Sequence, residues 1–110
     1  MNFLFQVQII AKNELSEIDF RKDVAQVLSI LDDICKIFGH NPNTPKYYPP
    51  GELIDAPDTW AIRYGAVLHS GASRHSALQS LMKSLQPLLD SLLPSCTLQW
   101  KTESLDFLLS

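Results

Sequence analysis

The sequence predicts an α+β domain in which two amphipathic helices lie on one face of a three- or four-stranded sheet. Two long segments, 16–38 and 73–93, space their apolar residues three and four positions apart, as helices with one buried stripe do. Three shorter segments, 2–11, 59–69 and 96–101, have the alternation or the aromatic and β-branched composition of strands. Elements in this order pack most simply as a two-layer α/β sandwich, so the whole chain is expected to form a single domain.

Each predicted strand has one irregular feature. In the first, Leu4 and Ile10 break the apolar–polar alternation, which indicates that the second face of the sheet is partly covered. In the second, Gly65 lies in mid-strand and indicates a bulge, a close approach of another segment, or the turn of a tight hairpin. The third begins at Cys96, and the tail 104–110 is expected to extend it, to pair as a fourth strand, or to dock as a short helix.

The helix boundaries follow from capping residues. The first helix is expected to begin near Ser16 or Asp19, and Gly39 is well placed to end it in a left-handed conformation. Ser73 is the candidate N-cap of the second helix. Pro87 lies inside the second helix and is expected to kink its axis or to restart the helix there, because proline removes a backbone hydrogen bond.

The region 39–58 differs in composition from the rest of the domain, since it holds five of the seven prolines. Proline removes backbone donors and blocks helix formation, so a proline-rich loop is expected here. The sequence leaves open a short strand at 46–48 or a turn of helix at 52–55. With the strand, the element order becomes the split βαβ pattern of a ferredoxin-like domain, a fold that serves many unrelated functions.

Composition and charge exclude several classes of protein. The 110 residues are 45% hydrophobic and 19% charged, as in an ordinary globular domain. The formal charge of −3, with only nine basic residues, argues against direct nucleic-acid binding, because phosphate contacts need clustered lysine and arginine. No apolar run approaches the length of a membrane span, and no membrane partner is expected.

The expected location is the cytoplasm. Residues 1–10 lack the basic start and the unbroken apolar run of a signal peptide. Cys35 and Cys96 lie far apart in the sequence, have no metal-binding or redox spacing, and fall on apolar faces, so both are expected to be buried thiols.

No catalytic or metal site is predicted, and no cofactor. The three histidines, His40, His69 and His75, sit in no motif with a nucleophile, and they lack the spacing of helical metal ligands. Ser73 lacks the flanking glycines of a nucleophile elbow. The protein is therefore expected to be non-catalytic, with one alternative.

That alternative is a small ligand-binding or enzymatic domain with an anion site at the strand-to-helix junction 70–75. Free backbone amides at a helix start attract anions, and a guanidinium with two hydroxyls would add to this attraction. The residues concerned are Ser70, Gly71, Ser73 and Arg74. Such a domain is expected to be a homodimer whose two sheets enclose the pocket.

The leading hypothesis places a protein-binding site at the proline-rich loop and its exit. Large aromatic residues beside carboxylates of one sign suit protein recognition, because the rings fill pockets and the charges steer encounter. The predicted site consists of Tyr47, Tyr48, Glu52, Asp55, Asp58 and Trp60. An acidic surface of this kind suits a basic partner, such as a nuclease with a cationic groove.

In size, acidity and lack of a catalytic constellation, the chain resembles the small bacterial immunity proteins, which neutralise a toxin domain by binding it. The resemblance rests on these general properties and on no motif. It implies an antitoxin that blocks a basic toxin or nuclease domain through the region 46–60.

Overall fold

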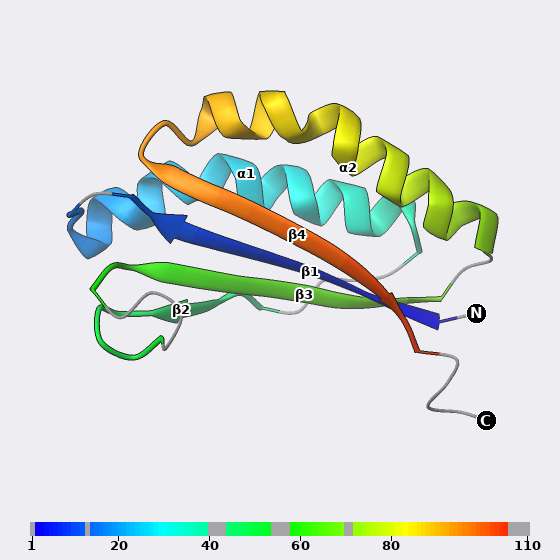
Figure 1. Cartoon of the computed structure of the whole chain (residues 1–110), viewed down its shortest axis with the longest axis horizontal. Helices are drawn as coiled ribbons and strands as arrows, with labels where there is room; N and C mark the ends of the chain where they lie inside the picture. The colour runs from blue at the N-terminus through cyan, green and yellow to red at the C-terminus, as the bar shows by residue number, and fades with distance from the viewer. Residues whose placement is uncertain (1, 13, 40–43, 54–57, 70–71, 106–110) are drawn as a thin grey trace.

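The computed structural model describes residues 2–12, 14–39, 44–53, 58–69 and 72–105. Its elements follow one another along the chain as four strands and two helices (Figure 1). They are β1 (Asn2–Ala11), α1 (Glu17–Ile37), β2 (Lys46–Tyr48), β3 (Ala61–His69), α2 (Ala72–Leu92) and β4 (Cys96–Ser104). The short strand is therefore the correct choice between the two alternatives for the proline-rich loop.

The four strands form one sheet in the order β2-β3-β1-β4, and every neighbouring pair is antiparallel. β3 lies between β1 and β2, so the first βαβ unit is split by a strand from later in the chain. This is the ferredoxin-like arrangement predicted for a chain whose loop supplies a strand. The α+β sandwich is confirmed.

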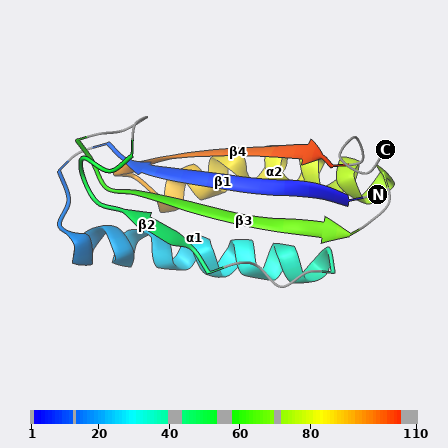
Figure 2. The ribbon, with the colours of Figure 1, turned by 90° about the horizontal axis from the view of Figure 1, so that it is seen from below.

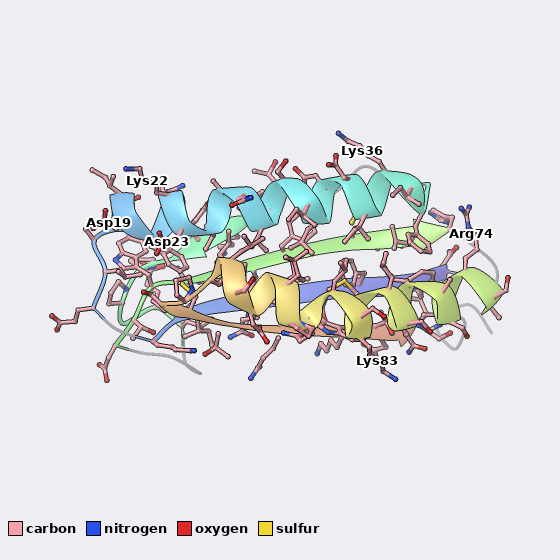
Figure 3. The ribbon with its side chains drawn as sticks, turned by 90° about the horizontal axis from the view of Figure 1, so that it is seen from above. Asp19, Lys22, Asp23, Lys36, Arg74 and Lys83 are labelled. Carbon is pink, nitrogen blue, oxygen red and sulfur yellow. The ribbon has the colours of Figure 1, made fainter. Side chains whose placement is uncertain are left out.

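Both helices cover the same face of the sheet and lie side by side along the strands (Figure 3). The opposite face, called the open face below, has no helix over it (Figure 2). Strand alternation and register assign its side chains, from β2 to β4. They are Lys46 and Tyr48; Ala61, Arg63, Gly65, Val67 and His69; Asn2, Leu4, Gln6, Gln8 and Ile10; and Thr97, Gln99, Lys101 and Glu103.

The hydrophobic core fills the space between the sheet and the two helices. β1 contributes every second residue from Phe3 to Ala11, all of them buried. α1 contributes a stripe that includes Phe20, Val27 and Leu31, and α2 adds Leu78, Met82 and Leu89. Burial of each such side chain stabilises the fold by about 1.5–3 kcal/mol.

The ends of α1 confirm the predicted caps. Ser16 has an extended backbone and its hydroxyl accepts a 3.2 Å hydrogen bond from the backbone N–H of Asp19. Gly39 has φ +83°, the left-handed region that glycine occupies without strain. Its N–H donates to the carbonyl of Lys36 at 3.1 Å, which satisfies one of the free carbonyls of the last turn.

The start of α2 corrects the prediction that Ser73 is its N-cap. The helix begins at Ala72, so Ser73 is its second residue. An N-cap residue precedes the first helical residue, and a residue inside the first turn cannot take that role. The helix also does not restart at Pro87, because it continues unbroken to Leu92. Buried Met82 and Leu89 hold the turns on either side of the proline against the sheet.

Two strand predictions also change in detail. The strand predicted from residue 59 begins at Ala61, and the strand predicted to end at residue 101 continues to Ser104. Gly65 pairs with Gln6 in unbroken register, which excludes both a bulge and a hairpin turn there. Of the tail 104–110, residues 106–110 lie outside the described part of the chain.

Candidate binding surfaces

The aromatic residues of the proline-rich loop do not form one exposed cluster, and this corrects the expected arrangement. Tyr47 pairs with buried Ile62 and shares its core-facing side of the sheet. Tyr48 lies on the open face, where Lys46 Nζ and the Arg63 guanidinium carbon are 5.1 and 5.4 Å from its ring centre. Successive residues of a strand point to opposite faces, so the two tyrosines cannot act together. Tyr48 has cationic neighbours, not acidic ones.

Tyr47 and Trp60 instead extend the core at one end of the sandwich. The Phe20 ring lies 6.2 Å from Tyr47, edge to face, and 6.4 Å from Trp60, stacked at 26°. The guanidinium of Arg21 sits 3.8 Å from the Tyr47 ring centre, and its Nε donates a 3.0 Å hydrogen bond to Glu17. Tyr47 and Trp60 are both partly buried by these contacts.

The carboxylates predicted for this site have separate positions. Glu52 and Asp58 are exposed. Asp55 lies outside the described residues. Asp58 and Trp60 share a recess of about 510 Å³ with residues that the sequence did not place there. We call it the acidic recess. Its described lining residues are Glu14, Leu15, Ser16, Pro50, Asp58, Thr59 and Trp60.

The antiparallel pairing of β1 and β3 builds the acidic recess. The end of β1 lies beside the start of β3, so the β1–α1 connection meets the chain that enters β3. A 3.0 Å hydrogen bond from the N–H of Ala11 to the carbonyl of Trp60 fastens the two segments. Glu14 therefore lies in the same recess as Asp58, although 44 positions separate them in the sequence.

One polar atom of the recess lacks a partner. The Thr59 hydroxyl oxygen is buried and makes no hydrogen bond to any residue that the structure describes. A buried hydroxyl without a partner costs free energy, so a donor from a bound group would be favourable here. The sequence carried no signal for this atom, because its burial depends on the packing of two loops.

The strand-to-helix junction has a different role for its arginine than anion binding. Arg74 Nη2 donates a 3.2 Å hydrogen bond to the carbonyl of Ile37, and its guanidinium carbon lies 5.6 Å from the Phe38 ring centre. It therefore joins the start of α2 to the end of α1 (Figure 3). Ser73 is exposed. Ser70 and Gly71 lie outside the described residues.

The next residue, His75, packs against the sheet. Its ring stacks on Phe3 at 4.4 Å between centres, and Nε2 lies 2.9 Å from the Thr102 hydroxyl. Both contacts join α2 to the strands. His75 thus has a structural explanation and is not needed for a ligand.

The two cysteines are buried free thiols in this structure. Burial raises the pKa of Cys35, and it raises the pKa of Cys96 to about 11, with a smaller contribution from the negative charge of Asp23. The thiolate is the reactive form, so neither side chain is a nucleophile at neutral pH. Among the described residues, no group of three or more His, Cys, Asp or Glu side chains could hold a metal ion.

Comparison with known proteins supports the fold only. No protein-family profile and no curated protein matches the chain. A crystal structure of a dimeric ferredoxin-like protein from an uncultured marine organism is similar, with a TM-score of 0.53 and 11% sequence identity over 92% of each chain. No helix in the described part of the chain has the length and apolar character needed to cross a membrane.

Proposed function

We propose that this chain is a non-catalytic protein-binding domain whose acidic recess receives a basic side chain of its partner. One observation carries the proposal. Two carboxylates from separate connections, those of Glu14 and Asp58, line a recess together with the Trp60 ring. No lysine or arginine occurs among the described lining residues to neutralise them.

Arginine fits the chemistry of this recess better than lysine. A guanidinium carries five N–H donors and pairs with carboxylates through more than one hydrogen bond, and its flat surface packs on aromatic rings. Glu14 and Asp58 supply the negative charge, Trp60 supplies a ring, and the Thr59 hydroxyl supplies an unused acceptor. Arg21 over the Tyr47 ring is an example of the same kind of contact within this chain.

The charge around the recess favours a basic partner. Asp19 and Asp23 lie at the same end of the molecule, in the first turns of α1 (Figure 3). An excess of one sign at a surface accelerates association with a partner of the other sign and selects against like-charged proteins. The nearest basic side chain of the α1 surface, Arg21, is already paired with Glu17.

The partner class that we propose is a basic toxin or nuclease domain, neutralised as an immunity protein neutralises its toxin. Supporting this are the acidic charge, the recess for a cationic side chain, and the absence of a metal cluster among the described residues. Two free buried cysteines agree with a reducing compartment, and we propose the cytoplasm.

The test uses an arginine-rich peptide as the probe and NMR of the labelled chain as the readout. Sedimentation of the chain alone comes first, because a homodimer, the other proposed partner, would change the stoichiometry. On addition of the peptide, the indole N–H signal of Trp60 is expected to shift. The double variant Glu14→Gln/Asp58→Asn is expected to bind at least about tenfold more weakly.

The matched control removes the same charge from another place. Asp33→Asn/Glu103→Gln neutralises two exposed carboxylates that do not line the recess. It should retain nearly the original affinity. Equal losses in both double variants, or peptide shifts far from Trp60, would show attraction by net charge alone and contradict the proposal.

A further inference from the structure

We infer that the open face of the sheet carries a second, independent site, which binds a small polar organic anion. A recess of about 410 Å³ lies on this face over β1, β3 and β4. The side chains that reach it from the open face are Gln6, Gln8, Arg63, Gln99 and Lys101. Its volume is within the range of about 300–1,000 Å³ that is typical of small-molecule sites.

Strand register arranges these side chains in two rows across the sheet. In the first row, Gln8 of β1 lies between Arg63 of β3 and Gln99 of β4. In the second row, Gln6 of β1 lies between Gly65 of β3 and Lys101 of β4. The two cations thus occupy diagonal corners, two strand spacings or about 10 Å apart across the sheet, with carboxamides between them.

Gly65 accounts for the hollow at the corner of the second row. A Cβ atom there would meet only ordinary contacts, 3.6 Å from the Phe5 carbonyl oxygen and 3.9 Å from Gln6 Cγ. The backbone therefore does not require glycine, and glycine in a strand interior weakens the strand. What glycine provides at this position is space above the sheet beside Gln6.

The charge of the open face is opposite to that of the chain as a whole. Lys46, Arg63 and Lys101 lie on it against one described carboxylate, Glu103, in a chain with a net charge of −3. Glu103 pairs with Leu4, one row beyond Lys101, and is not a lining residue of the recess. A negative ligand is thus the one that the lining favours.

The side chains define the chemistry of the ligand. A guanidinium and an ammonium bind carboxylate or phosphate oxygens, the first through paired hydrogen bonds and the second as a point charge. The three carboxamides offer both donors and acceptors, which suit hydroxyl and carbonyl groups. A hydroxylated carboxylate or a sugar phosphate combines these features, and no reaction is implied.

The test titrates the purified chain with citrate and, separately, with ribose 5-phosphate by calorimetry, with sodium chloride keeping the ionic strength constant. Binding of at least one probe is expected below about 10 mM, with a rise in melting temperature from preferential binding to the folded state. Binding of citrate alone identifies a carboxylate ligand, and binding of ribose 5-phosphate alone identifies a phosphate.

Three variants locate the site. Lys101→Gln is expected to weaken binding about tenfold, and Gly65→Val to abolish it by filling the recess. Lys83→Gln makes the same change of charge at an exposed position of α2, over the other face of the sheet (Figure 3). It should bind as the unaltered chain does.

Three results would overturn the inference. The first is no binding of either probe at about 10 mM to a chain that melts cooperatively. The second is equal weakening by Lys101→Gln and Lys83→Gln, which would indicate attraction by general charge. The third is a chain that sediments as a dimer and becomes monomeric in Gly65→Val, because a second copy would then occupy the face.

Discussion

The hydroxyl of Tyr64 donates a 2.9 Å hydrogen bond to Oδ1 of Asp32 and so joins the centre of β3 to α1. The same oxygen lies 3.4 Å from Cys35 Sγ. Tyr64 is only 3% exposed, and burial together with these two neighbours raises the pKa of its hydroxyl above the ordinary value. It therefore keeps its proton and remains a donor. This contact fixes where α1 sits along the sheet.

Tyr64→Phe should lower the free energy of unfolding by about 1 kcal/mol, since it removes the donor and leaves the ring in place. Urea unfolding followed by circular dichroism measures the change. Tyr48→Phe is the matched control, because the contacts of Tyr48 with Lys46 and Arg63 involve its ring. Equal stability of Tyr64→Phe and the unaltered chain would mean that the hydrogen bond contributes nothing.

Arg74→Ala should destabilise the chain by about 0.5–1 kcal/mol, because the carbonyl of Ile37 loses its hydrogen bond at the end of α1. The loss is expected to be the same with and without inorganic phosphate in thermal unfolding. A phosphate-induced rise in melting temperature that disappears only in Arg74→Ala would instead support the anion site at residues 70–75.

Gly39→Ala should cost about 1 kcal/mol, since φ +83° is a strained conformation for any residue with a Cβ atom. An added Cβ meets nothing within 4 Å, so the cost comes from the backbone and not from a clash. Gly39→Asn should lose less, because asparagine tolerates the left-handed region. Chemical unfolding of both variants separates this account from a packing effect, which would make asparagine the worse substitution.

Stability should fall at alkaline pH as thiols ionise in the unfolded chain. The pKa of Cys96 rises from 9.0 to about 11 on folding, so the folded state holds its proton more tightly. The resulting stabilisation is complete below pH 9 and is lost as pH rises from 9 towards 11 and beyond. Burial shifts the pKa of Cys35 in the same direction.

Cys96→Ala tests this linkage, because it removes one of the titrating groups. Its free energy of unfolding should decline less steeply than that of the unaltered chain between pH 9 and pH 11, by up to about 1.4 kcal/mol per pH unit. Urea midpoints across that interval provide the measurement. Parallel curves for the two proteins would show that Cys96 titrates normally in the folded state.

Local patterns in the sequence were sufficient for most of the fold. The boundaries of β1 were predicted at Asn2 and Ala11, and the cap at Ser16 and the left-handed Gly39 were predicted as they occur. These features depend on interactions within a few residues, such as side-chain alternation and hydrogen bonds in one helical turn. A short strand at 46–48 was one of two alternatives, because three residues carry too little periodicity to decide.

The candidate sites depended on the tertiary structure. Tyr47 and Tyr48 look like one aromatic pair in the sequence, yet the pleat of β2 sends them to opposite faces. Glu14 and Asp58 look unrelated, yet the antiparallel pairing of β1 and β3 brings them to one recess.

The sequence by itself thus determined the helices, three of the strands and the class of fold, since each follows from the repeat of apolar residues along a short segment. Only the tertiary structure decided which polar groups share a surface. That outcome depends on strand order and register, which are set by the joint burial of residues far apart in the chain, as Gly65, Gln6 and Lys101 in a single row show.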